Sequence, residues 1–526
     1  MQFRDTAVWV FIAIVLIAVP YAHAIPAFSR QYGTSCTTCH IDFPKLNDFG
    51  KAFKDAGFKF PKNDEDFIKI PPVMLGAPAQ KELFPKVIWP GTIPGIPQVG
   101  LRYNQYFQYT GKSANNYYAN QFLASSTPGA LLPPAVQQTD FEPGFFSIFM
   151  AGNFGSDIGF WVDDDISVGG LNSNGELGDG YLRFVNIGRF LKLPTDALTL
   201  RVGQFELDLP FTLARTINIS PYDIYTEFNM SVIPASGPTS VNNLTEMDLA
   251  GHGVELSGGH LYKGYHYSLA IIDQNTSNTT STATNVPTPT GGQIGAPGVG
   301  FFSDSNFKDI YTNFSYRFNL EKDPASRNEV QAAGPTGPRD HTYLSVGAFS
   351  FYGKSAQRYS GFLSNGTTPA VVTAHEPFYR AGGDFSFNYR TFNLFGLYMY
   401  GHDNNLLLNS ATIPTGFVGA PAVKFNGGFL EADYLALPWL MTIMRWDRVQ
   451  SSTDFLNGAG SGNYFSPAGS TRDRITPGVQ FLIHANIKTS FEYAFRPQQA
   501  LSYNASGQAV NPFRTNTATA ALEFVY

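Results

Sequence analysis

The sequence predicts an all-β transmembrane barrel of about sixteen antiparallel strands, preceded by a small N-terminal α-helical segment. The first observation behind this prediction is the composition. Charged residues make up 14% of the 526 residues, whereas about 25% is usual in soluble domains. Aromatic residues reach 15%, yet the mean hydropathy is only −0.12. An aromatic-rich, charge-poor chain without long apolar runs fits strands that present apolar side chains to lipid only at alternate positions.

The second observation is a series of short alternating segments that begins near residue 98. In one of them, Phe160 and Val162 fall on a face that suits lipid, and Trp161 falls on a face that suits a lumen. Each segment is near the roughly 9–11 residues that a tilted membrane strand needs. We expect the strands at 98–110, 143–153, 156–167, 178–189, 196–208, 249–258, 264–274, 306–318, 341–353, 379–389, 392–401, 425–434, 437–449, 473–483, 486–496 and 516–526.

The third observation is that long and short connections alternate along the chain. Outer-membrane barrels have long external loops and short periplasmic turns, so the alternation predicts a porin-like architecture for this chain. The terminal residues 521–526 also alternate and end in an aromatic residue, Tyr526, as the assembly signals of such barrels do. A soluble β-sandwich or propeller would explain the strands but not these two features. The long connections are 111–142, 209–248, 275–305, 354–378, 402–424, 450–472 and 497–515.

Residues 1–24 have the features of a secretory signal peptide. Arg4 supplies a basic start, an apolar run extends from Ala7 to Pro20, and a small-x-small pattern ends at Ala24. The apolar run is shorter than the roughly 20 residues of a spanning helix, and no other uninterrupted apolar segment is long enough to be one. We therefore expect cleavage after Ala24 and export of the remaining chain.

The two cysteines of the chain both lie in the pentapeptide Cys36-Thr37-Thr38-Cys39-His40. This is the C-x-x-C-H pattern of covalent haem c attachment: two thioethers fix the porphyrin, and the adjacent His40 becomes the proximal iron ligand. The alternatives are a zinc site, a Cys36–Cys39 disulfide and a chance match. Zinc would need further ligands, and residues 25–100 contain no other cysteine or histidine. A redox disulfide would need a thioredoxin-like context, which is missing.

The residues around the motif predict a small haem-binding domain over 25–60. Phe49 and Phe53 lie on one stripe of a helix that would stop at Gly57, with the Phe face toward the porphyrin or the barrel mouth. Residues 61–97 form a Pro- and Gly-rich linker that could belong in part to the haem domain, and the barrel occupies 98–526. Met74 in the linker is one candidate for the distal iron ligand; a barrel histidine and an open position are the others.

Taken together, the signal peptide, the C-x-x-C-H motif and the predicted barrel resemble the fused outer-membrane monohaem cytochrome c–porin family of iron-oxidising bacteria. The resemblance is carried by the motif with its flanks over 26–60, including Phe43-Pro44-Lys45-Leu46-Asn47-Asp48-Phe49-Gly50, and by residues 203–210, Gly-Gln-Phe-Glu-Leu-Asp-Leu-Pro. Elsewhere only the architecture matches. The resemblance implies an outer-membrane protein of a Gram-negative bacterium, with its haem at the periplasmic side or inside the barrel. It implies oxidation of extracellular Fe(II) and transfer of the electron to a periplasmic c-type cytochrome.

Two alternatives remain open from the sequence: a relay for another small extracellular reductant, and a diffusion porin whose haem domain is a structural plug. The net charge of −6 and the lack of a basic tract argue against nucleic acid as a partner. No hydrolytic or transferase motif is present. The expected partners are outer-membrane lipid, an extracellular reductant and a periplasmic c-type cytochrome. Asp163 and Asp165 are candidates for guiding cations along a lumenal wall, although such residues more often keep a lumen hydrated.

Overall fold

The computed structural model describes residues 27–526 with gaps. The described ranges are 27–61, 64–83, 85, 91–95, 99–110, 138–167, 177–194, 196–212, 216–219, 224–225, 247, 250–260, 264–273, 307–320, 342–362, 369–408, 417–451, 471–495, 502–503, 509–510 and 516–526. The expected signal peptide lies outside them. Among these residues, none of the helices has the length and apolar character that crossing a membrane requires.

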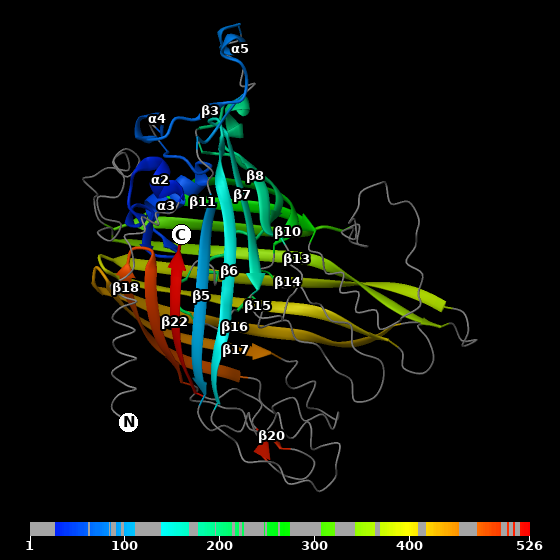
Figure 1. Cartoon of the computed structure of the whole chain (residues 1–526). Coiled ribbons are helices and arrows are strands. Elements are labelled where there is room, and N and C mark those ends of the chain that lie inside the picture. Colours follow the sequence, from blue (N-terminus) through cyan, green and yellow to red (C-terminus); the bar gives the residue numbers. More distant parts are fainter. Residues whose placement is uncertain are drawn as a thin grey trace, which may run out of the picture.

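Sixteen antiparallel strands form one closed barrel, so the predicted antiparallel barrel and its strand number are confirmed (Figure 1). Each strand pairs with its neighbour in sequence, and β22 closes the barrel against β5. The strands are β5 (Val99–Thr110), β6 (Gln138–Phe154), β7 (Ile158–Ser167), β8 (Leu177–Phe184), β9 (Thr199–Phe205), β10 (Gly251–His260), β11 (Tyr265–Asp273), β12 (Asp309–Asn319), β13 (Tyr343–Phe362), β14 (Pro369–Tyr389), β15 (Phe392–Leu408), β16 (Phe417–Leu437), β17 (Leu440–Ser451), β18 (Thr471–His484), β19 (Ile487–Ala494) and β22 (Thr517–Val525).

The two faces of the strands follow the predicted alternation. On β12, Tyr311 and Asn313 are buried in the lumen, whereas Ile310 and Phe314 are 39% and 55% exposed on the outside. On β7, Trp161 packs against the buried clusters of the interior, as predicted for its face. Apolar side chains therefore cover the outer surface, which is what a lipid-facing barrel requires.

Two of the predicted long loops are largely strand. The connections expected at 354–378 and 402–424 are shortened because β13, β14, β15 and β16 extend through most of them. These four strands reach beyond their neighbours at the end of the barrel opposite the N-terminal segment (Figure 1). The pattern of alternate apolar residues is required only inside the membrane, so it does not mark strand that continues outside it. A smaller correction is the segment 178–189, where β8 ends at Phe184 and a 3-10 helix η2 (Ile187–Leu191) follows.

The N-terminal segment sits at the end of the barrel where the turns are short and where β22 ends (Figure 1). Its elements are α2 (Ala27–Tyr32), η1 (Cys36–Thr38), β1 (His40–Asp42), β2 (Lys45–Leu46), α3 (Asp48–Asp55), α4 (Asp64–Phe67), β3 (Val73–Met74), α5 (Pro78–Leu83) and β4 (Thr92–Ile93). The predicted Phe stripe lies on α3, where Phe49 and Phe53 are buried in a cluster with Tyr32, Phe58 and Phe60. Phe67 and Ile68 pack on the same cluster, so the first part of the expected linker is folded with the segment.

A second element lies inside the barrel. Residues 206–212 and 216–219, which we call the strap, follow β9 and lie in the lumen, although most of them were predicted to belong to an external loop. Phe211 packs on Phe395 of β15 and Phe429 of β16. Further along, the backbone NH of Ile219 donates to Glu492 of β19 at 2.7 Å. Buried apolar side chains explain why the strap turns inward, because Leu207, Leu209 and Phe211 would otherwise be exposed to water.

Candidate haem site in the barrel mouth

The C-x-x-C-H motif forms one tight turn. The backbone NH of Cys39 donates to the Cys36 carbonyl at 3.1 Å, and both thiols are free, so the disulfide alternative is not formed. Asn47 holds this turn in place: its side-chain amide donates to the Thr38 carbonyl at 2.9 Å and its carbonyl accepts the NH of Gly50 at 2.8 Å. The same residue is the N-cap of α3. The motif and the helix behind it are therefore fixed to each other by one side chain.

The His40 ring is oriented by the backbone. Its Nδ1 lies 3.3 Å from the carbonyl oxygen of Pro44, and because a carbonyl can only accept, Nδ1 carries the proton. This leaves Nε2 free to bind a metal, the arrangement that metal-binding histidines usually have. Burial lowers the pKa of His40 to about 4, so the ring is neutral above that pH. Two free thiols in one turn and an imidazole with a free Nε2 fit a covalently attached haem c.

Sequence reasoning did not assign the roles of Asn47 and Pro44. Asn just before an aromatic stripe, followed by an acidic residue in the first turn, is an N-cap signal, and it could have identified Asn47 as the cap. Nothing local identifies Pro44 as the partner of His40, because that contact depends on how the chain turns between β1 and β2.

Contacts around the rim of the mouth hold the segment in the barrel. Lys45 forms an ion pair with Asp433 of β16 at 2.7 Å, and Asp48 pairs with Arg317 of β12 at 2.6 Å. At a third point the backbones of the segment and of β7 are so close that only glycine fits. A Cβ on Gly159 of β7 would lie 2.7 Å from the Cα of Gly57. The segment is therefore wedged between strands on different sides of the barrel.

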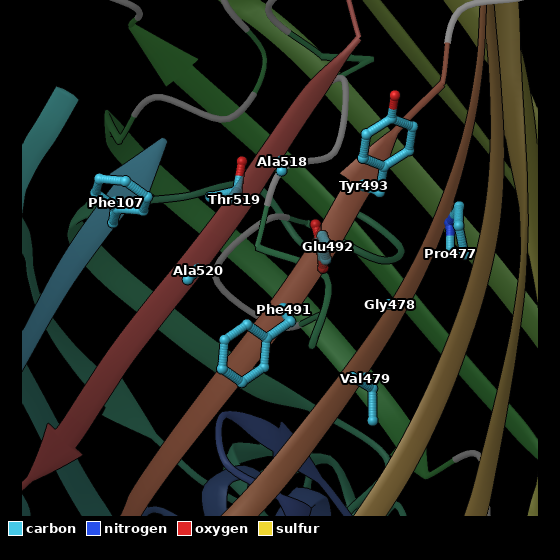
Figure 2. A pocket seen from close by; sticks show the side chains of 10 residues that line it. All are labelled: Phe107, Pro477, Gly478, Val479, Phe491, Glu492, Tyr493, Ala518, Thr519 and Ala520. Carbon is cyan, nitrogen blue, oxygen red and sulfur yellow. The ribbon is translucent and has the colours of Figure 1, made fainter. Parts of the chain in front are cut away.

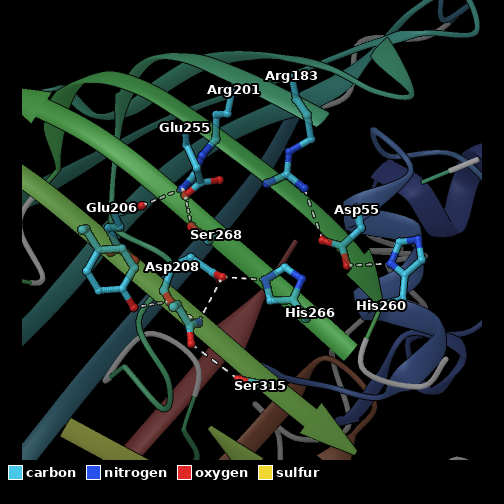
Figure 3. A network of polar contacts seen from close by, with 12 residues as sticks. Asp55, Arg183, Arg201, Glu206, Asp208, Glu255, His260, His266, Ser268 and Ser315 are labelled. Atoms are coloured by element: carbon cyan, nitrogen blue, oxygen red, sulfur yellow. Dashed lines mark hydrogen bonds and ion pairs between the residues drawn. The ribbon is translucent and has the colours of Figure 1, made fainter. Parts of the chain in front are cut away.

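A polar network fixes α3 to the wall (Figure 3). Asp55 accepts from Arg183 of β8 at 3.3 Å and lies 3.2 Å from Nδ1 of His260 at the end of β10. Burial by itself would raise the pKa of Asp55, but the hydrogen bond to His260 and the charge of Arg183 outweigh it and lower the pKa to about 2. The carboxylate is thus charged at every pH at which the barrel would normally work.

A second group of polar contacts involves the strap (Figure 3). His266 of β11 pairs with Asp208 of the strap at 2.6 Å, and Arg201 of β9 donates to the Glu206 carbonyl at 3.1 Å. At its far end the strap reaches the N-terminal segment, because Ile217 belongs to a buried cluster against which Ile41, the residue after His40, packs. The described residues thus bring the strap and the N-terminal segment into contact inside the barrel.

A cationic clamp surrounds Phe43, on the closing seam of the barrel. Arg102 of β5 lies over the Phe43 ring at 5.1 Å, and the ammonium of Lys488 of β19 lies 5.5 Å from the ring centroid. Lys488 also donates to the Phe43 carbonyl. Glu523 of β22 accepts from both cations, at 2.6 Å from Arg102 and 3.2 Å from Lys488.

The remaining residues predicted from the sequence lie apart from the C-x-x-C-H motif. Met74 is 41% exposed on β3, and no described contact joins it to Cys36, Cys39 or His40. Asp163 accepts the backbone NH of Asp179 of β8, so its carboxylate is engaged with the neighbouring strand. Asp165 lies in β7, but its side chain is outside the described residues.

A groove of about 630 Å³ lies on the wall formed by β5, β18, β19 and β22 (Figure 2). Its rim carries Phe107, Phe491 and Tyr493, which are exposed on the outer face of the barrel. None of the motif residues lines it. The groove therefore belongs to the lipid-facing surface and not to the candidate site.

Neither a family model nor a curated protein matches the chain. Solved structures that resemble it include a loop-deletion mutant of OmpT, an outer-membrane protein of Vibrio cholerae (8% identity, TM-score 0.41, covering 82% of this chain and 99% of that one). Others are the outer-membrane channel DcaP of Acinetobacter baumannii (11%, 0.40, 82% and 97%) and OmpF of Salmonella typhi (11%, 0.42, 83% and 98%). At these identities and scores we draw no functional argument from the similarity.

Proposed function

We propose that this chain is an outer-membrane electron-transfer protein that oxidises an extracellular reductant, Fe(II) being the first candidate, and passes the electron to a periplasmic c-type cytochrome. The observation that carries the proposal is the motif itself: two free thiols in one turn beside an imidazole whose Nε2 is free, in a segment wedged into a transmembrane barrel. A haem bound there would supply a one-electron iron couple. The resemblance to cytochrome–porin fusions supports Fe(II) as donor.

The residues of the chain have distinct parts in this function. Cys36 and Cys39 would hold the porphyrin, and the Pro44 carbonyl keeps His40 in the tautomer that can bind iron. Asn47 fixes the turn that carries the two thiols and His40. The rim contacts of Lys45 and Asp48 place this unit in the mouth, so that the barrel shortens the distance between an external donor and a periplasmic acceptor across a hydrocarbon layer of about 30 Å.

The test begins with covalent haem. Denatured wild-type protein should give a c-type pyridine haemochrome spectrum that is retained after acid–acetone extraction, and Cys36→Ser/Cys39→Ser should lose it. Stopped-flow mixing with Fe(II) should then reduce the haem of the detergent-solubilised holoprotein. Reduction by dithionite but not by Fe(II) would move the proposal to another extracellular donor. Lack of covalent haem in protein exported with an intact maturation system would refute it.

The second candidate is a diffusion porin with a structural haem plug, and the closed sixteen-strand barrel is the observation that favours it. Against it, the described segment and strap both lie across the lumen. Conductance in planar lipid bilayers separates the two. A porin should give steady ion-permeable channels with the segment docked, whereas an electron-transfer barrel should conduct little until the segment or the strap is released.

A further inference from the structure

One of the charged groups close to the haem motif comes from the barrel wall and not from the motif's own segment. Lys488 of β19 is 3% exposed at its side chain and donates to the carbonyl of Phe43, three residues after His40. The Phe43 ring lies between the two groups: its centroid is 5.7 Å from that of His40 and 5.5 Å from the Lys488 ammonium. Adding the two distances bounds the separation of the ammonium from the His40 ring at about 11 Å.

We propose that Lys488 is a potential-setting residue: its buried ammonium raises the reduction potential of a haem held by His40. The inference rests on the proposed haem attachment and goes beyond it, because it assigns part of the redox site to the barrel wall. Its physical basis is that oxidised haem carries one more positive charge than reduced haem. A fixed cation nearby therefore disfavours the oxidised form.

Glu523 of β22 allows a second, opposite test of the inference, because it carries the negative charge in the same clamp. It lies 3.2 Å from Lys488 and 2.6 Å from Arg102, and its side chain is as buried as that of Lys488. Removing the cation and removing the anion should shift the potential in opposite directions. Asp42, Arg102, Lys45 and Asp48, which are also charged and lie near the motif, stay unchanged in both variants, so their contributions cancel from the comparison.

The size of the effect follows from the distance bound. A unit charge at about 11 Å in an effective dielectric constant of about 20 changes a one-electron equilibrium by about tenfold. For a one-electron couple, tenfold corresponds to about 59 mV. The distance used here is the upper bound on the separation between the Lys488 ammonium and the His40 ring.

The experiment is a spectroelectrochemical titration of the haem in the detergent-solubilised holoprotein, with four variants of the full chain. Lys488→Gln should lower the midpoint potential by about 59 mV, the equivalent of tenfold, and Glu523→Gln should raise it by a similar amount. Lys488→Arg keeps the charge and should stay near wild type. Lys308→Gln removes a cation that pairs with Asp273 at the other end of the barrel, and it should leave the potential unchanged.

A purely structural role for the clamp predicts something else. If Lys488 only holds Phe43 in place, both neutral variants loosen the segment, the potential moves in the same direction in both, and trypsin cuts the segment faster. That result, or no shift in either variant, would overturn the inference. The titration uses chemical mediators and not Fe(II), so it remains decisive even if Fe(II) is not the donor. Only failure to find covalent haem would remove both proposals together.

Discussion

The contact between Gly57 and Gly159 gives the most direct test of how the N-terminal segment is held in the barrel. Gly159 lies in β7, and a Cβ added to it would stand 2.7 Å from the Cα of Gly57, 2.9 Å from its oxygen and 3.0 Å from its carbonyl carbon. All three atoms are backbone, so no flexible side chain can move aside. Gly57 itself has φ +79°, a conformation that favours glycine, so the segment cannot easily change its path there.

Gly159→Ala should therefore push the segment away from the wall. Overpacking of this kind typically costs about 1–3 kcal/mol, which weakens docking by a factor of roughly 5 to 150. The barrel itself should still fold, because the strain lies at the contact with the segment. We expect the heat-modifiable band of the folded barrel to be unchanged while trypsin cleaves the segment faster, at residues such as Lys51 and Lys54.

The matched control is Gly383→Ala in β14, the same chemical change in another barrel strand. There the nearest atom to an added Cβ is 3.5 Å away, which is ordinary contact, so cleavage should proceed as in wild type. Equal cleavage rates for Gly159→Ala and wild type would refute the reasoning. Such a result would mean that the segment does not rest on β7 at Gly57.

Three further predictions follow from the site. Asn47→Ala removes an N-cap worth about 1 kcal/mol and the brace on the motif, so the ratio of covalent haem to folded barrel should fall; Asn47→Asp, which keeps the cap acceptor, should retain more. Met74→Ala should leave the reduced visible spectrum unchanged because the side chain is exposed, and an altered spectrum would show that the thioether reaches the iron. Asp55 has a pKa lowered from 3.8 to about 2, so its contribution to docking is complete above pH 4 and is lost as the pH falls toward 2. Protease protection measured against pH should follow that window in wild type and vanish from it in Asp55→Asn.

The barrel could be predicted because its evidence is local. Strands that face lipid on one side must alternate every second residue, and the sixteen alternating segments correspond to the sixteen strands. The same reasoning could not give the full length of β13 to β16, since outside the membrane neither face needs apolar residues. The strap was missed for a related reason: an inserted loop and an external one have the same turn-rich composition. The alternation of Leu207, Leu209 and Phe211 was the available signal that part of it is buried.

The haem prediction rests on a different kind of signal, the residue spacing that covalent attachment requires, and it stays a prediction. What surrounds the motif could not be predicted. Lys488 contacts a residue 445 positions away, and Lys45 pairs with a residue 388 positions away. No periodicity or motif links such positions, because the closed barrel alone brings them together. Sequence reasoning can thus propose the haem-binding residues, but it cannot find the charges that the fold brings around them.

The distribution of the rim contacts bears on why the haem segment and the barrel form one chain. Exposed ion pairs contribute little individually, often less than about 1 kcal/mol. Here the partners stand on β8, β12 and β16 and on the closing seam of β5, β19 and β22, so the segment cannot tilt away from one side without straining another. A segment fixed in this way keeps a constant distance from the charges on the wall. On the proposed function, the barrel then does more than carry the haem segment: β19 and β22 supply a cation and an anion whose balance acts on the haem.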